Sequence, residues 1–399
     1  MAGVVLLRRR ADRRLVEPGP NSTYNRLSIP VGKLSSEKEF MKLSNRRQKT
    51  FDLRLGLAMA CLLAIGSPAF AQTAPSQPTT GPGGSQYTHA TVTTNGPYWA
   101  NNQTTQNQFE YFIYEPGSPT PAQAPVILFL HGYSAFTPQS YLYWIDHMVL
   151  KGYTVVWVQY QASVLTAPSK YLPNARAAWS DALNRLQNFW WENHVKPQMS
   201  TNGQMETLIV GHSVGAFTGA GLAATISGTP TVPVPFGLVL IEPGSKGLVP
   251  AQDYSKIYAG TPMVMVIGDQ DTVVCDTTAS RIWNVSSQIP SSLKNLLWIQ
   301  SDTHGTPQQL GNHFFPGTSG FDDTAAVDDR DYNITWKLSV AMADCVFGNT
   351  TNDPNACSIA LGAGNPLQTT MGNWSDNTPV KPLVYYTNPS GLPPIQGCN

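Results

Sequence analysis

The feature that most constrains the fold is a series of short, apolar segments separated by helical patterns. Residues 126–130 read VILFL, with no polar position that could face solvent. A strand of this kind is buried on both faces, which is typical of parallel sheets covered by helices. Strands are expected at 109–114, 126–130, 153–160, 207–210, 237–241, 263–267 and 296–300, and helices at 138–151, 174–193, 214–227 and 332–347. The chain is therefore predicted to be α/β, with a mostly parallel central sheet flanked by helices in a single domain.

The N-terminal part has the pattern of an export signal. Residues 55–66 (LGLAMACLLAIG) follow a basic stretch and precede Ala69-Phe70-Ala71. A basic region, a short apolar region and an A-x-A site are the parts of a secretory signal peptide. We therefore expect 1–40 to be an upstream extension, Met41 the true start, and 41–71 a signal peptide that sends the protein to the periplasm or the medium. An uncleaved anchor is the alternative, but a span needs about 20 apolar residues, so no stable membrane anchor is expected.

Composition divides the rest of the chain. Residues 72–107 are rich in Thr, Gly, Pro, Asn and Gln, which predicts a flexible leader, with 88–94 as the candidate for a first strand. Residues 108–348 contain the α/β pattern, and 349–399 are expected to be a loop-rich tail that packs on this domain. From Gln72 onward there are 12 Lys and Arg against 20 Asp and Glu. A formal charge of −8 disfavours nucleic-acid and anionic-membrane binding.

Four cysteines remain once the signal peptide is removed: Cys275, Cys345, Cys357 and Cys398. An even number in an exported chain predicts disulfide bonds, and four cysteines allow three pairings. Cys345 and Cys357 are close in sequence, and a Cys275–Cys398 bond would then tie the tail to the domain. Four free buried thiols are the alternative, and no zinc-type spacing of Cys and His occurs.

The chemistry centres on Ser213. Gly211-His212-Ser213-Val214-Gly215 matches G-x-S-x-G, and it lies between the expected strand 207–210 and the small-residue helix from Val214. A strand, a sharp turn and a helix are the context in which this motif exposes a nucleophilic serine. An ordinary N-cap serine in a glycine-rich turn is the alternative.

A serine nucleophile needs a base, a carboxylate and an oxyanion hole. Asp271 follows the strand 263–267 and His304 follows the strand 296–300, so the order Ser, Asp, His is one that catalytic triads use. We expect Asp271 and His304 to complete the triad, with Asp269 and His313 as the alternatives. The backbone N–H groups of Tyr133 and Val214 are the expected oxyanion donors. His131 and His212 are expected to be hydrogen-bonding neighbours rather than bases.

These segments together resemble a known superfamily. VILFLHGYSA, LIVGHSVGA, MVIGDQDTVV and WIQSDTHG are similar to the α/β-hydrolases. The HGY step and the exported, disulfide-bearing chain most resemble the cutinase-like, polyester-hydrolase and chlorophyllase-like carboxylesterases. The resemblance covers roughly residues 109–347 and implies an α/β-hydrolase catalytic domain. It implies an exported serine hydrolase that cleaves small or polymeric carboxylic esters through an acyl-enzyme, with Ser213, Asp271 and His304 as the triad.

Other functions remain open on the sequence alone. An amidase, peptidase or acyltransferase would use the same triad, and a ligand-binding protein could keep the fold without turnover. There is no G-x-G-x-x-G after a strand and no P-loop, so no nucleotide cofactor is expected. We expect neither an organic cofactor nor a metal, and a monomer. Trp144, Trp157, Tyr160, Trp190 and Trp191 could form an aromatic platform for a substrate, but core packing is favoured for all five.

Overall fold

The computed structural model describes residues 72–399 except 101–102, 104–105, 227–231, 321–324 and 399. The expected extension (1–40) and signal peptide (41–71) therefore lie outside the described residues. Among the helices that are described, none combines the length and the apolar character needed to cross a membrane.

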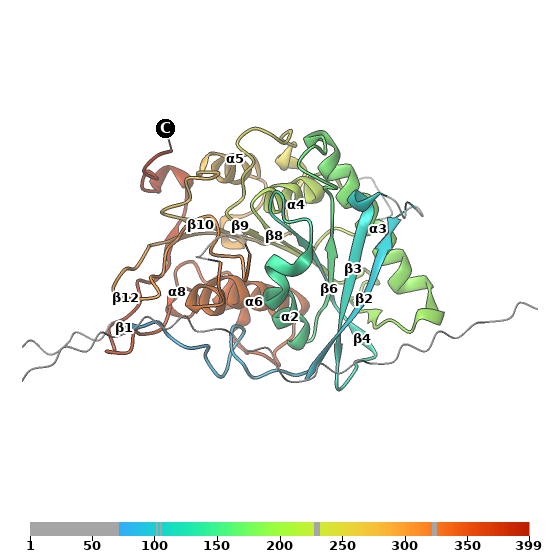
Figure 1. The fold of residues 1–399 in the computed structure, drawn as a ribbon, viewed down its shortest axis with the longest axis horizontal. Helices are drawn as coiled ribbons and strands as arrows, with labels where there is room; N and C mark the ends of the chain where they lie inside the picture. The colour runs from blue at the N-terminus through green and yellow to red at the C-terminus, as the bar shows by residue number, and fades with distance from the viewer. Residues whose placement is uncertain (1–71, 101–102, 104–105, 227–231, 321–324, 399) are drawn as a thin grey trace, which may run out of the picture. The chain divides into compact units, whose positions relative to one another are not determined.

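A nine-stranded sheet forms the centre of the described chain, in the order β13-β11-β10-β9-β8-β5-β6-β3-β2 (Figure 1). The six strands from β11 to β6 run parallel, whereas β13 at one edge and β3 and β2 at the other are antiparallel to their neighbours. The predicted α/β fold with a mostly parallel sheet is thus confirmed. The strands of this sheet are β2 (Thr91–Trp99), β3 (Glu110–Gly117), β5 (Val126–Leu130), β6 (Thr154–Val158), β8 (Thr207–His212), β9 (Gly237–Ile241), β10 (Met263–Gly268), β11 (Lys294–Ile299) and β13 (Val384–Tyr386).

Helices cover both faces of this sheet (Figure 1). Along β5, Leu128 packs into the core under α3 and α4, whereas Phe129 packs into the core under α2 and α6. The alternation follows from the pleat, which points successive side chains to opposite faces. Burial on both sides explains why β5 carries no polar position. The helices are α2 (Leu142–Leu150), α3 (Tyr171–Asn188), α4 (Val214–Thr225), α5 (Thr277–Val285), α6 (Trp336–Phe347), α7 (Ala356–Ala360) and α8 (Pro366–Thr369).

Segments at both ends of the domain are more structured than composition suggested. The expected flexible leader, 72–107, contains the edge strand β2 and the short strand β1 (Gln72–Thr73), which pairs with β12 (Gly305–Thr306). The tail adds β13 to the other edge of the sheet. Two further short strands, β4 (Gln123–Ala124) and β7 (Lys196–Pro197), pair with each other. Strand β2 contains Gly and Pro, and β13 has three residues, so neither shows the apolar periodicity of a central strand.

The five candidate platform aromatics separate into two groups. Trp144, Trp157 and Tyr160 are fully buried, as core packing predicts. Trp190 and Trp191 follow the end of α3 and are 77% and 57% exposed. Core packing is therefore wrong for these two, because α3 ends at Asn188 and they lie in a short 3-10 turn, Trp190–Glu192, that has no buried residue.

Two disulfides link the four cysteines, Cys275 to Cys398 and Cys345 to Cys357. The predicted disulfide bonding is confirmed, with one bond joining α6 to α7 in the tail and one joining the end of the tail to the loop after β10. The alternative of four free thiols is excluded by this pairing.

Candidate active site

Ser213 occupies a sharp turn between β8 and α4. Its φ is +58°, a value that non-glycine residues adopt only where the surrounding structure imposes it. The turn needs the glycine on its helix side: a Cβ added at Gly215 would lie 2.1 Å from the carbonyl oxygen of Leu130 and 2.4 Å from that of His131. The helix can approach the end of β5 this closely only without a side chain there. The turn therefore holds the Ser213 hydroxyl at the carboxyl edge of the sheet.

His313 connects Ser213 to a buried carboxylate. The Ser213 hydroxyl and His313 Nε2 are 2.8 Å apart, and His313 Nδ1 lies 2.9 Å from Oδ2 of Asp271. The other carboxylate oxygen of Asp271 accepts the backbone N–H groups of Val273 and Val274, each at 3.0 Å. These bonds hold the carboxylate in one orientation, so that Nδ1 of His313 carries the proton and Nε2 is free to accept one from Ser213. The three side chains form a continuous proton-transfer chain.

The structure corrects the choice of histidine. His304 does not contact Ser213; its Nε2 lies 2.8 Å from Oδ2 of Asp376, and its side chain is 38% exposed. The reason is the path of the chain after β11. Asp302 and Gln309 pair across an antiparallel bridge, which holds His304 within a projecting turn. The chain then returns beside the end of β10, where Gln270 N–H donates to the carbonyl of Gly311, and this return brings His313 to Ser213.

Of the two aspartates after β10, the structure brings Asp271 to the histidine and turns Asp269 away from it. Asp269 accepts hydrogen bonds from the backbone N–H and the hydroxyl of Ser301, at 2.8 and 2.5 Å. It thereby joins the loop after β10 to the loop after β11. Asp269 positions the loops, whereas Asp271 faces the imidazole.

The two neighbouring histidines are buried hydrogen-bonding groups, as expected. His212 accepts from the Tyr141 hydroxyl at Nδ1 and donates from Nε2 to the carbonyl of His313. The same hydroxyl accepts the backbone N–H of Gly132, so one network joins the loop after β5 to the loop that carries His313. Burial lowers the pKa of His212 well below its ordinary value and that of His131 to about 4. Both are therefore neutral near pH 7.

The expected oxyanion donors lie beside the serine. Tyr133 follows β5 and Val214 follows Ser213, and both line the same cavity as the serine hydroxyl. Across the described part of the chain, no hydrogen bond uses the backbone N–H of Tyr133 or of Val214. Two unengaged N–H groups next to a serine can bind the oxygen of a tetrahedral intermediate.

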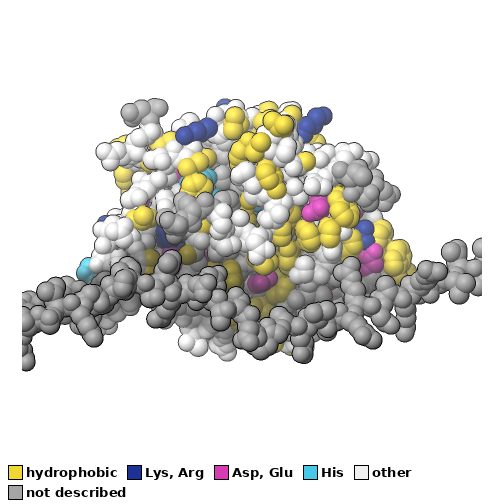
Figure 2. Space-filling view, in the orientation of Figure 1, with side chains coloured by type: hydrophobic (Ala, Val, Ile, Leu, Met, Phe, Trp, Pro, Cys, Tyr) yellow, Lys and Arg dark blue, Asp and Glu magenta, His cyan; other side chains and the backbone are white. Residues whose placement is uncertain are grey.

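The cavity above Ser213 has a volume of about 290 Å³ and a mostly apolar wall. Its hydrophobic members include Leu248, Val273, Val274 and Phe314. The lining also includes Lys246, whose Nζ donates a hydrogen bond to the carbonyl of Thr272. Figure 2 shows one face of the molecule, where hydrophobic side chains gather in patches with only scattered charged groups between them. An apolar pocket with a few convergent polar groups suits a small organic group.

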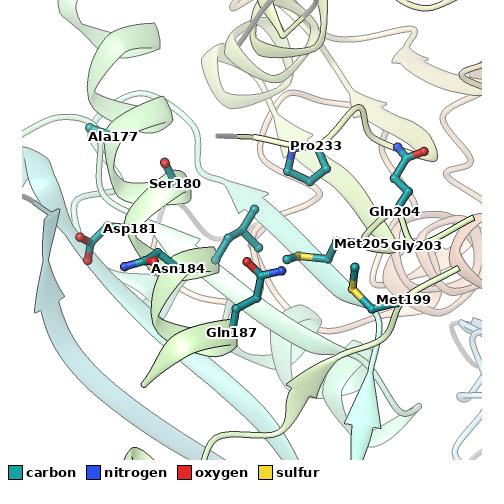
Figure 3. Close-up of a pocket in the computed structure, with 11 residues that line it drawn as sticks. Ala177, Ser180, Asp181, Asn184, Gln187, Met199, Gly203, Gln204, Met205 and Pro233 are labelled. Atoms are coloured by element: carbon teal, nitrogen blue, oxygen red, sulfur yellow. The ribbon is translucent and has the colours of Figure 1, made fainter. Parts of the chain in front are cut away.

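A larger hollow of about 640 Å³ runs along α3, away from the serine (Figure 3). It is lined by polar side chains of the helix, such as Ser180 and Asn184, and by Met199 and Met205. Its described lining includes no histidine, and Asp181 at its edge accepts the hydroxyl of Tyr111. The hollow therefore lacks the partner that would activate Ser180.

One carboxyl group at the site escaped the sequence analysis. Glu242 directly follows β9, is buried, and places Oε2 3.4 Å from Nδ1 of His313. Burial, and next the charge of Asp271, raise the pKa of Glu242 well above its ordinary value. The rule that located Asp271, an acidic residue in the loop after a buried parallel strand, would also have found Glu242, which follows the strand in LVLIE.

His212, Glu242 and His313 each bring one possible metal ligand within 4.8 Å of the others. All four ring nitrogens of the two histidines already have hydrogen-bond partners. A metal ion needs an imidazole lone pair, so this cluster does not suit one without breaking the network.

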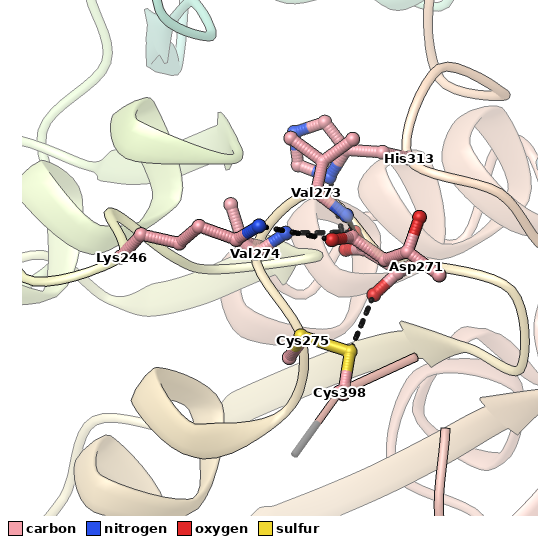
Figure 4. Close-up of a disulfide and its surroundings, with 8 residues drawn as sticks. Lys246, Asp271, Val273, Val274, Cys275, His313 and Cys398 are labelled. Atoms are coloured by element: carbon pink, nitrogen blue, oxygen red, sulfur yellow. Dashed lines mark hydrogen bonds and ion pairs between the residues drawn. A yellow bond between two sulfur atoms is a disulfide. The ribbon is translucent and has the colours of Figure 1, made fainter. Parts of the chain in front are cut away.

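The Cys275–Cys398 disulfide lies directly beneath the triad carboxylate (Figure 4). Cys275 comes four residues after Asp271, and Cys398 Sγ is 3.6 Å from the backbone oxygen of Asp271. The bond thus ties the C-terminal end of the tail to the loop that orients Asp271.

Removing this disulfide with Cys275→Ala and Cys398→Ala is expected to lower the free energy of unfolding by about 4–5 kcal/mol, because it closes a long loop, the two cysteines being separated by 123 positions in sequence. The matched control, Cys345→Ala with Cys357→Ala, opens a span of 12 residues and should cost about 3 kcal/mol. Urea denaturation of the three proteins measures both. Equal losses in the two variants would contradict the loop-closure argument.

Comparison with known proteins identifies no relative of this chain. No family model matches the chain, and no curated protein matches it. The function must therefore be argued from the geometry of the site.

Proposed function

We propose that this protein is an exported serine hydrolase with an α/β-hydrolase fold that cleaves carboxylic esters. The observation that carries the proposal is the chain of contacts from Ser213 through His313 to Asp271. The unengaged N–H groups of Tyr133 and Val214 and the apolar cavity support it. The two disulfides and the signal-like segment 41–71 support export.

The reaction follows from the positions of these groups. His313 takes the proton of Ser213 as the serine oxygen attacks the ester carbonyl. The backbone N–H groups of Tyr133 and Val214 hold the oxyanion, and removal of one such donor typically costs about 10²–10³ in rate. Asp271 stabilises the imidazolium that forms. His313 then protonates the departing alcohol, and a water that it deprotonates releases the acid from Ser213.

The pH dependence should reflect the unusual surroundings of His313. Burial lowers its pKa, but the hydrogen bond to Asp271 and the negative charge of that carboxylate outweigh burial and raise the pKa of His313 overall. The base must be neutral to accept a proton, so activity is lost as pH falls through this raised value. We expect kcat/KM to keep rising above pH 6.5, the ordinary value for histidine, and to level off only at alkaline pH. A pH–rate profile with a midpoint at or below 6.5 would contradict this expectation.

The deciding experiment compares the unsubstituted protein with Ser213→Ala for hydrolysis of p-nitrophenyl butyrate. We expect the variant to lose activity by about 10⁴-fold or more, and a fluorophosphonate to label the unsubstituted protein only. Equal rates from both proteins would remove Ser213 as the nucleophile. A panel that adds amides and alcohol acceptors separates ester hydrolysis from amidase and acyltransferase activity.

A further inference from the structure

Glu242 is the one buried carboxyl at the site that has no defined task. Its side chain is 1% exposed, and within the described residues neither of its oxygens has a hydrogen-bond partner. Its Oε2 is 3.4 Å from His313 Nδ1, which is too long for a strong hydrogen bond. Burying a carboxyl group that makes no hydrogen bond is energetically costly. Its position behind the imidazole therefore calls for an explanation.

The two carboxyl groups that face Nδ1 are stabilised very differently. Asp271 accepts two backbone N–H groups in addition to His313, and such bonds favour the ionised form. Near Glu242 the backbone N–H of Gly268 has only a small effect on the carboxyl and forms no hydrogen bond with it, and the titratable groups that face it are Asp271, His313 and His212. Two buried carboxylates on one imidazole repel each other, so only one of them is charged. Asp271 is the ionised group, and Glu242 keeps its proton.

We propose that Glu242 is a second positioning acid for His313, neutral beside an ionised Asp271 and able to take over the Nδ1 contact when that charge is lost. This inference rests on the proposed function, because it assigns Glu242 to the same proton-transfer chain. With the charge of Asp271 removed, Glu242 releases its proton to solvent. Its carboxylate then accepts the N–H of Nδ1 and keeps His313 in the tautomer that can deprotonate Ser213.

Asparagine at position 271 isolates this role. The oxygen of the new amide would stay on the N–H groups of Val273 and Val274, so the amide nitrogen would face Nδ1. In a triad with a single acid, this arrangement favours the wrong tautomer and lowers kcat by about 10⁴-fold. A carboxylate at 242 competes for Nδ1 and opposes that change.

The test compares Asp271→Asn, Glu242→Gln and the double variant in the full chain, with p-nitrophenyl butyrate as substrate. We expect Asp271→Asn to lose only about 10–10²-fold in kcat, Glu242→Gln less than about tenfold, and the double variant the full loss of about 10⁴-fold. The acid limb of the pH–rate profile of Asp271→Asn should be steeper than that of a single ionisation, because both His313 and Glu242 must lose a proton for activity. A merely structural glutamate would not produce that steeper limb.

The inference is overturned if Asp271→Asn and the double variant lose the same activity, about 10⁴-fold each, with native circular dichroism. If the double variant does not fold, ¹H NMR of Asp271→Asn decides instead. A downfield Nδ1 proton of His313 that persists supports the proposal, and its disappearance refutes it. Failure of the proposed function looks different, because Ser213→Ala would then be as active as the unsubstituted protein.

Discussion

His313→Ala is expected to lower kcat for an ester substrate by about 10⁴-fold or more, whereas His304→Ala should stay within about twofold of the unsubstituted protein. The first change removes the group that joins the Ser213 hydroxyl to Asp271. The second removes a partly exposed side chain whose nearest partner is Asp376. Steady-state kinetics of both variants, made and purified together, measures the difference.

The two histidine variants also control for folding. His313 is buried against His212 and Phe314, so its removal could disturb packing as well as chemistry. Thermal unfolding and labelling of Ser213 by a fluorophosphonate separate these effects. A variant that is folded but lacks the base should keep the melting temperature of the unsubstituted protein and react more slowly with the fluorophosphonate. A large loss in His304→Ala, with His313→Ala nearly intact, would show that the base had been placed on the wrong histidine.

Gly215→Ala is expected to destabilise the protein by about 3 kcal/mol, in the upper range for overpacking in a core. The added methyl would lie 2.1 Å from the carbonyl oxygen of Leu130, a backbone atom of a central strand that cannot move alone. The start of α4 must shift away from β5 and carry Ser213 with it. We therefore expect kcat to fall together with stability, as measured by urea denaturation and ester hydrolysis.

The matched control is Gly221→Ala in the same helix. The closest atom to its added methyl would be Cγ of Gln252, at 3.0 Å, and that side chain can rotate. Alanine also favours a helix interior over glycine by about 1 kcal/mol. We expect stability within about 1 kcal/mol of the unsubstituted protein. If both variants unfolded equally early, the close approach of Gly215 to β5 would not be the cause.

Local pattern was enough to predict the elements that build the carboxyl edge of the sheet. Strands β5 and β9 were predicted at their observed bounds, because a strand buried on both faces leaves an unbroken apolar run. The placement of Ser213 between β8 and α4 followed from a motif that needs only neighbouring residues. Asp271 was also predictable, because it lies three residues beyond the end of β10 and cannot move far from it.

Elements whose stability comes from distant partners were not predictable in this way. The edge strand β13 exists because β11 offers it unpaired backbone groups, which its own three residues do not indicate. Strand β2 overlaps the strand expected at 88–94, but its extension to Trp99 depends on pairing with β3. The disulfide from Cys275 to Cys398 could be suggested by elimination, but its position beneath Asp271 depends on where the tail ends in space.

The amino-acid sequence by itself determined the α/β class and the places of Ser213 and Asp271 at the carboxyl edge of the sheet, because each depends on residues within one strand and the turn that follows. The tertiary structure decided that His313 rather than His304 meets Ser213, and that Glu242 faces the same imidazole. The bridge between Asp302 and Gln309 turns His304 outward, and the return of the chain at Gly311 brings His313 inward. The preference for His304 rested on its shorter distance in sequence from the strand. That criterion was wrong, because the path of the loop in space decides which of its residues reaches Ser213.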